Sequence, residues 1–224
     1  MYNLREFVKL DYFTVKPYFT GKNLLIYGAM VLFLTIMSAD ISAGIGIGMM
    51  LATMHTGYPF VAGEKCNMDA LYVSLSVGKK TVVLGRYIFT LLLNICIVLV
   101  VVAFTMIVML VYGILGNGFQ TAAGGGVLLI MPALFMIMQA VQLPFYFKLG
   151  YAKAKFISII PFAALMAGYM AFTGFLGGMS GLGEALNNIF AADWYAYLAA
   201  GVAFLVIVFA SYRLSLAFYK KREF

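Results

Sequence analysis

The sequence predicts an all-α integral membrane protein that crosses the bilayer six times and has both termini in the cytosol. Apolar residues make up 64% of the 224 residues and charged residues 10%, whereas ordinary soluble domains contain roughly 45–50% and about 25%. The mean hydropathy of +1.00 agrees with this excess. A soluble core cannot bury so many apolar side chains, so we expect residues 1–224 to form a single transmembrane domain with short loops.

Six apolar runs are each long enough, or nearly so, to cross about 30 Å of hydrocarbon. The predicted spans cover residues 23–39, 41–62, 87–115, 126–147, 156–177 and 194–218. The third run is the longest, and we expect this helix to tilt or to project beyond the bilayer. The first run ends in a poor match to a cleavage site, so we take it as a retained span.

All 15 Lys and Arg residues lie on one side of this six-span topology. The opposite side carries only the acidic residues Asp40, Glu184 and Asp193. The positive-inside rule makes the basic side cytosolic. The net charge of +7 therefore reflects membrane orientation, and the basic residues form no aromatic-interleaved stripe of the kind that binds nucleic acid.

Residues 1–22 are predicted to form an amphipathic helix in the cytosolic headgroup layer. Apolar side chains recur there at helical spacing, at Leu4, Phe7, Val8, Tyr12, Val15 and Phe19. An aromatic-rich basic segment of this kind favours the membrane interface. Pro17 and Gly21 provide the bend into the first span. A disordered basic tail is the alternative, and the density of aromatic residues argues against it.

Two predicted spans carry faces of small residues at four-residue intervals. These residues are Gly44, Gly48 and Ala52 in the second span and Ala163, Ala167 and Ala171 in the fifth. Small residues let helix backbones approach closely. We expect these faces to pack within the subunit; a face that slides or dimerises during a functional cycle is the alternative.

The longest internal cytosolic segment joins the second and third spans, and residues 64–80 are predicted to contain a short helix. Asn67 can cap it, and Asp69 in its first turn favours the positive end of the helix dipole. The helix would continue through residues 70–75 and end at Gly78. Such a helix, held outside the bilayer by two spans, is well placed to contact a cytosolic partner.

At this segment the sequence resembles the permease subunits of type-2 ATP-binding-cassette exporters, particularly a small six-span bacterial group. The resemblance covers residues 59–88. The matching residues are Pro59-Phe60, Glu64-Lys65, Ser74-Leu75, Val77, Lys79-Lys80-Thr81-Val82-Val83-Leu84 and Gly85-Arg86-Tyr87-Ile88. The chain departs from the family pattern at Ser76, where proline is frequent, and at Gly63, where an acidic residue is frequent.

The resemblance implies a multi-pass protein of the bacterial cytoplasmic membrane. Residues 1–22 would be its elbow helix, and residues 64–80 would be the coupling helix that docks in a cleft of an ATPase subunit. The residues implied to contact the ATPase are Glu64, Lys65, Asn67, Asp69, Ala70, Leu71, Leu75, Lys79 and Lys80. A second permease copy or a homologue would complete the transport pathway.

The same resemblance implies how transport is powered and which molecules are transported. The chain has no GxxxxGK[ST] phosphate loop, so ATP and Mg²⁺ are expected on the ATPase subunit, with no cofactor on this chain. The resemblance is closest to exporters of amphipathic cytolytic peptides, such as phenol-soluble modulins, and to bacteriocin immunity exporters. It implies amphipathic peptides or lipid-like molecules as cargo. Candidate pathway residues are His55, Met50, Met54 and Asn94, because Met-rich surfaces accommodate varied apolar cargo.

An enzyme is the weaker interpretation, and no catalytic or metal-binding residues are predicted. His55 is the single histidine, whereas a metal site needs three or four ligands and serine hydrolysis needs a base beside a GxSxG element, which is missing. A hydrogen-bonded structural His55 is favoured over a gating role. The rival hypothesis remains an ATPase-independent membrane protein, either an intramembrane enzyme or an accessory or immunity protein.

Overall fold

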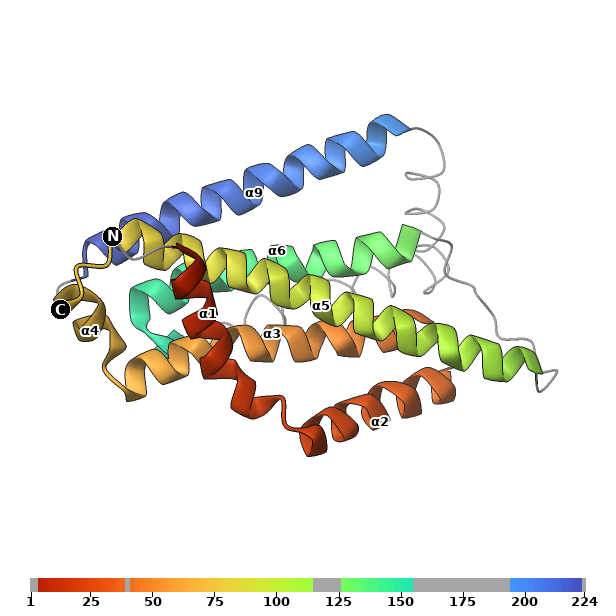
Figure 1. Ribbon diagram of the computed structural model, residues 1–224. Coiled ribbons are helices and arrows are strands. Elements are labelled where there is room, and N and C mark those ends of the chain that lie inside the picture. The colour runs from red at the N-terminus through yellow and green to blue at the C-terminus, as the bar shows by residue number, and fades with distance from the viewer. Residues whose placement is uncertain (1–3, 39–40, 115–125, 155–193, 223–224) are drawn as a thin grey trace. The chain divides into compact units, whose positions relative to one another are not determined.

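The structure is a computed structural model that describes residues 4–38, 41–114, 126–154 and 194–222. Its regular elements in these ranges are helices (Figure 1). They are α1 (Leu4–Val15), the short 3₁₀ helix η1 (Lys16–Tyr18), α2 (Gly21–Ser38), α3 (Ile41–Lys65), α4 (Met68–Ser74), α5 (Lys79–Ile114), α6 (Gly126–Leu149) and α9 (Trp194–Lys220). The predicted fifth span, residues 156–177, lies outside the described residues, as does its face of alanines.

The chain divides into two compact units. The first comprises residues 1–136 and 222–224, and the second comprises residues 137–221. In the second unit, the Ser211 hydroxyl of α9 donates a hydrogen bond to the Ala140 carbonyl of α6. The Phe147 and Tyr219 rings meet edge to face at 5.4 Å. The first unit contains α1 to α5 and holds the features on which the functional argument depends.

The N-terminal segment forms the predicted helix and bend. Helix α1 and helix α2 meet at an angle of 77°, and Pro17 lies in η1 between them. The Asn23 side chain donates a hydrogen bond to the Tyr18 carbonyl, which holds the start of α2 against the bend. The buried side of α1 includes Phe7 and Val15. The rest of the unit therefore covers part of the apolar face of this helix, whereas Tyr12 of the same face is 53% exposed.

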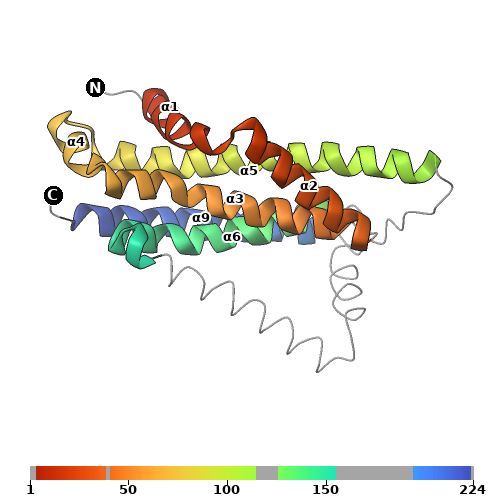
Figure 2. The same ribbon diagram turned by 90° about the horizontal axis from the view of Figure 1, so that it is seen from below.

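The small-residue face of α3 packs against α5 within the chain (Figure 2). A side chain at Gly48 would overlap the side chain of Val101. Val101 belongs to a buried cluster with Val31 of α2 and with Met49 of α3. Close helix approach at Gly48 brings these apolar groups together, in agreement with the expectation of packing within the subunit.

Helix α5 extends beyond the start of the predicted third span. It contains 36 residues and starts at Lys79, whereas the third span was predicted to start at residue 87. At 1.5 Å per residue its length is about 54 Å, which exceeds the hydrocarbon core. The difference arises because basic residues mark where a helix leaves the bilayer, and a helix continues past that point until its backbone pattern is interrupted.

The turns around α4 use two residues in the left-handed backbone region. Asn67 has a φ of 49° and Ser76 a φ of 52°. The predicted helix cap at Asn67 is therefore corrected, because an N-cap residue has an extended backbone. A left-handed residue just past Lys65 is instead typical of the turn that follows a helix, so Asn67 belongs to the turn after the end of α3. The departure at Ser76 also has a physical reason, since proline is locked near a φ of −65°.

Among the residues that the structure describes, two helices are long and apolar enough to cross a membrane. They contain Lys79–Val108 of α5 and Leu198–Lys220 of α9. The bent pair formed by α1 and α2 would be a third if it is one broken span. These helices agree with an all-α membrane protein. The count of six spans and the cytosolic placement of both termini stay predictions.

Candidate functional site at the elbow and coupling helices

Helices α3, α4 and α5 of the first unit meet where α4 connects α3 to α5, and α1 packs against α3 and α5 beside this connection (Figure 2). We call the buried contact between them the junction. It comprises Phe7 and Asp11 of α1, Phe60 of α3, Tyr72 of α4, and Gly85 and Arg86 of α5. The predicted coupling segment is thus anchored on the predicted elbow helix.

A buried ion pair joins α1 to α5. Arg86 Nη1 lies 3.2 Å from Asp11 Oδ1, and the two side chains are 6% and 1% exposed. Removing two charges from water costs several kcal/mol per ion, so each charge depends strongly on its partner. Burial raises the pKa of Asp11 to about 6, against the opposing effect of the Arg86 charge. The carboxylate is therefore mostly ionised at neutral pH.

Two aromatic rings flank the guanidinium of Arg86. Its carbon lies 4.8 Å from the centroid of the Phe60 ring and 5.8 Å from that of the Phe7 ring. A planar guanidinium suits this setting, because it can pair with a carboxylate and contact aromatic faces at the same time. Arg86 thereby connects α1, α3 and α5 through one side chain.

Gly85 makes the approach of α1 to α5 possible. A Cβ atom at this position would overlap the ring of Phe7, which is itself almost fully buried. Any larger residue would push the Phe7 ring away from α5. The glycine that precedes Arg86 in the sequence therefore has a packing role, and the two neighbouring residues act on the same contact.

Phe7 also contacts α4. The centroids of the Phe7 and Tyr72 rings are 5.2 Å apart, with their planes inclined by 59°. Tyr72 is buried, and burial raises the pKa of its hydroxyl. Phe7 is therefore packed between α4 and α5, and α4 cannot move independently of α1 without breaking this contact.

The C-terminal segment contacts α4 and α5 through a second, more exposed set of polar interactions. Arg222 Nη1 lies 3.4 Å from Asp69 Oδ2 of α4. Lys79 Nζ at the start of α5 donates a hydrogen bond to the Arg222 carbonyl at 3.0 Å. Partly exposed pairs contribute little to stability, but these two contacts bring Arg222 to both sides of the turn that follows α4.

The predicted coupling residues lie on the outer surface of this region. Ala70, Leu71 and Leu75 are exposed in or just after α4, whereas Tyr72 points inward. Glu64 and Lys65 end α3. The remaining members are Asn67 in the turn, Asp69 in α4, and Lys79 and Lys80 at the start of α5. One side of α4 therefore faces the junction and the other is accessible.

Sequence reasoning did not single out the junction, although one signal could have revealed part of it. Asp11 stands four residues from Phe7 and four from Val15, so it lies on the buried face of the amphipathic helix. An acidic side chain on such a face requires a partner of opposite charge. The sequence does not say which of the basic residues that partner is.

The structure does not bring the candidate pathway residues together. Met50 and Met54 are 48% and 55% exposed, one turn apart on α3. Asn94 is buried on α5, where its amide donates a hydrogen bond to the Thr90 carbonyl at 2.9 Å. His55 is also buried, with its Nδ1 2.7 Å from the Leu51 carbonyl. The last contact agrees with the favoured interpretation of a hydrogen-bonded histidine.

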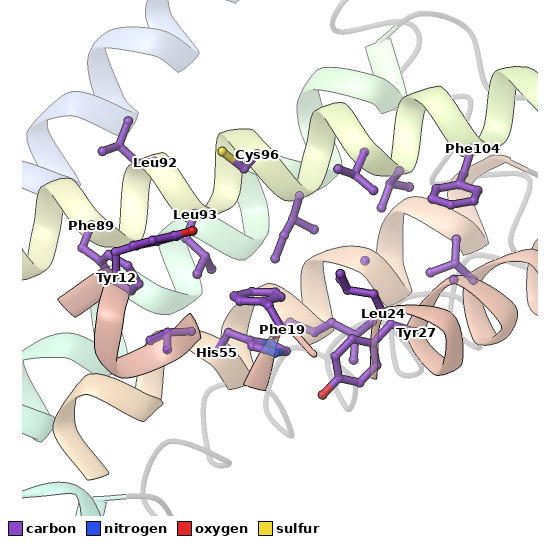
Figure 3. Close-up of a pocket in the computed structure, with 18 of the residues that line it drawn as sticks. Tyr12, Phe19, Leu24, Tyr27, His55, Phe89, Leu92, Leu93, Cys96 and Phe104 are labelled. Carbon is purple, nitrogen blue, oxygen red and sulfur yellow. Dashed lines mark hydrogen bonds between the residues drawn. The ribbon is translucent and has the colours of Figure 1, made fainter. Parts of the chain in front are cut away.

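Three aromatic rings surround His55. Phe19 stacks on the imidazole at a centroid distance of 4.7 Å, and Tyr27 and Tyr58 approach it edge-on at 5.4 Å and 5.1 Å. Within the described ranges, no three His, Cys, Asp or Glu side chains gather as metal ligands. His55 is therefore packed among aromatic rings and makes one backbone hydrogen bond through Nδ1 (Figure 3).

Comparison with known protein families identifies the chain's family. The family described as "ABC-2 family transporter protein" matches residues 6–220. That range covers nearly the whole chain and includes every residue of the junction. No curated protein and no solved structure matches the chain.

Proposed function

This chain belongs to the ABC-2 family of transporter proteins, and from this premise we propose that it is the permease subunit of an ATP-binding-cassette exporter in the bacterial cytoplasmic membrane. A separate ATPase subunit supplies the energy and holds ATP and Mg²⁺. Two copies of the chain, or one copy with a homologue, form the transport pathway between them.

The observation that carries this proposal is the position of α4. Its inner side is fixed to α1 and α5 through Tyr72 and Phe7, and its outer side exposes Leu71 and Leu75. Exposed apolar side chains on a short helix at the end of long helices are suited to bury in a partner cleft. We assign the ATPase contact to this outer side.

The junction supports a mechanism for coupling. ATP binding must favour one permease arrangement over another, and that preference must pass from α4 to the membrane helices. Because Arg86 and Phe7 connect α1, α3, α4 and α5, a force on α4 acts on these helices together. The 36-residue α5 then carries the displacement along its length.

The cargo we propose is an amphipathic peptide or a lipid-like molecule. Met50 and Met54 expose flexible side chains on α3, and such side chains adapt to apolar surfaces of varied shape. Neither is charged, in keeping with a pathway for amphipathic rather than ionic cargo.

Co-purification with the ATPase encoded beside the permease tests the proposal. A Leu71→Ala/Leu75→Ala variant should lower ATPase retention and stimulation about tenfold, since losing apolar anchors at an interface costs on the order of 1–2 kcal/mol. Leu84→Ala is the matched control, because Leu84 is similarly exposed on α5 outside α4. Equal retention by both variants would remove the docking assignment.

The rival function is an ATPase-independent membrane protein. It would be supported if purified permease failed to retain or stimulate any ATPase that carries a phosphate loop and is encoded beside it. To identify the cargo, ATPase activity should be measured with each member of a panel of peptides and lipids. The cargo is the member that stimulates ATP hydrolysis.

A further inference from the structure

The orientation of α4 depends on contacts with other elements. This helix has seven residues, Met68–Ser74, and connects α3 to α5 (Figure 2). An isolated helix of this length is not stable in water, because so few backbone hydrogen bonds do not offset the cost of nucleation. The exposed side of α4 therefore faces a partner in a fixed direction only when its inner side is held by the rest of the protein.

Two side chains one helical turn apart hold this inner side. Tyr72 packs against the Phe7 ring of α1, with the ring centroids 5.2 Å apart. Asp69 Oδ2 lies 3.4 Å from Arg222 Nη1. Residues three apart on a helix are neighbours on its surface, and the exposed leucines of α4 project from a different side. One contact leaves a short helix free to pivot about it, and a second contact one turn away removes that freedom.

Arg222 reaches both ends of the connection between α4 and α5. Its guanidinium pairs with Asp69 in the first turn of α4. Its backbone carbonyl accepts a hydrogen bond of 3.0 Å from Lys79 Nζ at the start of α5. The turn between the two helices is closed, since the Val77 amide donates to the Tyr72 carbonyl at 2.9 Å. Arg222 therefore holds α4 and the start of α5 in one arrangement.

The pair of Arg222 and Asp69 is partly shielded from water. Its side chains are 33% and 25% exposed, compared with 50% and 53% for the surface pair of Lys9 and Glu6. Shielded pairs are screened less by salt than exposed ones. A partly exposed pair shifts an equilibrium about threefold. Such a shift is small for the stability of the whole protein but measurable for the orientation of one short helix.

We propose that Arg222 is a positioning residue for the docking of the ATPase. By holding Asp69 it keeps Leu71 and Leu75 directed outward before the ATPase arrives, and it does so without touching the ATPase. Preorganisation of this kind raises affinity, because less conformational freedom is lost on binding. The inference rests on the proposed function, since it concerns the same docking surface, and its first test therefore uses the permease alone.

Hydrogen exchange of the purified permease in detergent tests the positioning without the ATPase. Arg222→Ala should increase the exchange rate of the α4 backbone amides about threefold. Lys221→Ala is the matched control, because it removes the same charge from the exposed neighbouring residue, and it should leave the rate unchanged. Equal rates in Arg222→Ala and the wild type would overturn the proposal, whatever the outcome with the ATPase.

Titration with the ATPase encoded beside the permease tests the consequence for docking. Arg222→Ala should raise the ATPase concentration that gives half-maximal stimulation about threefold. Maximal stimulation should stay unchanged, because the bound ATPase itself then holds α4. Lys221→Ala should change neither quantity. A lower maximal stimulation at an unchanged half-maximal concentration would contradict the positioning role.

A double-mutant cycle separates positioning from direct contact between Arg222 and the ATPase. If Arg222 acts through Asp69, Arg222→Ala should have no further effect on the half-maximal concentration in an Asp69→Asn protein. An equal effect in both backgrounds would show that Arg222 contacts the ATPase directly, and it would overturn the proposal. A wild type that stimulates no ATPase would instead remove the proposed function, and hydrogen exchange would still decide whether Arg222 positions α4.

Discussion

Asp11 of α1 and Arg86 of α5 form an ion pair of 3.2 Å in which both side chains are almost fully buried. The pair joins the N-terminal helix to the start of the longest helix, 75 residues further along the chain. Because Arg86 also contacts Phe7 and Phe60, helix α1 and the adjoining ends of α3 and α5 are parts of one packed structure.

Arg86→Met should strongly destabilise the protein at pH 8. The substitution leaves an ionised Asp11 buried without its partner, and breaking a buried pair costs about 3–5 kcal/mol. Adding Asp11→Asn should restore most of the lost stability, because the double variant has no unpaired buried charge. Thermal unfolding in detergent measures both effects.

Lys9→Met is the matched control for this cycle. Lys9 pairs with Glu6 at a similar distance, 3.1 Å, but both side chains are about half exposed. Its loss should change stability by less than about 1 kcal/mol. If the Arg86 and Lys9 variants unfolded at the same temperature, the buried pair would contribute no more to stability than the exposed pair does.

Stability should depend on pH through Asp11. Burial raises the pKa of this carboxyl from 3.8 to about 6, so the folded protein binds its proton more tightly than the unfolded chain does. The stabilising contribution of protonation is therefore complete below about pH 4 and is lost as pH rises through about 6. Arg86 and Tyr72 are the charged and titratable side chains that face Asp11, and burial raises the pKa of Tyr72 further above this window.

Unfolding temperatures measured from pH 4.5 to pH 8 reveal this dependence. The stability of the wild type relative to Asp11→Asn should fall between about pH 4.5 and pH 7 and then level off. Parallel profiles for the two proteins would show that Asp11 does not titrate with a raised pKa.

Gly85→Ala should destabilise the junction, while Gly63→Ala should not. A Cβ at residue 85 overlaps the Phe7 ring, whereas a Cβ at residue 63 meets its nearest neighbour, an Arg86 nitrogen, at 3.8 Å. Overpacking of this kind costs typically about 1–3 kcal/mol. Thermal unfolding compares the two variants, and Phe7→Leu should partly rescue Gly85→Ala. A similar loss in both glycine variants would contradict the packing role of Gly85.

Ser76→Pro should disrupt coupling to the ATPase, whereas Ser76→Gly should preserve it. Ser76 has a φ of 52°, which glycine adopts freely and proline cannot adopt. The proline variant must therefore rearrange the turn between α4 and α5. Membrane insertion and ATPase stimulation should be measured together, with insertion unchanged in both variants. Normal stimulation by Ser76→Pro would show that the geometry of this turn is unimportant.

Helix positions were largely predictable because they depend on local composition. The predicted spans at residues 126–147 and 194–218 correspond to α6 (Gly126–Leu149) and α9 (Trp194–Lys220) within two residues at each end. Helix α5 begins at Lys79, eight residues before the predicted third span, in keeping with a helix that projects beyond the bilayer. Charged residues end an apolar run without ending the backbone hydrogen-bond pattern.

The sequence by itself determined the membrane class of this protein, its amphipathic first helix and the short helix between the second and third predicted spans. Composition, periodicity and glycine placement are properties of neighbouring residues, and they act before any tertiary contact forms. The pairing of Asp11 with Arg86, the packing of Phe7 on Gly85 and the burial of His55 beneath Phe19 were decided by the tertiary structure. Each joins groups that are far apart in the chain, and only the packing of α1 and α2 on α3 and α5 makes them neighbours.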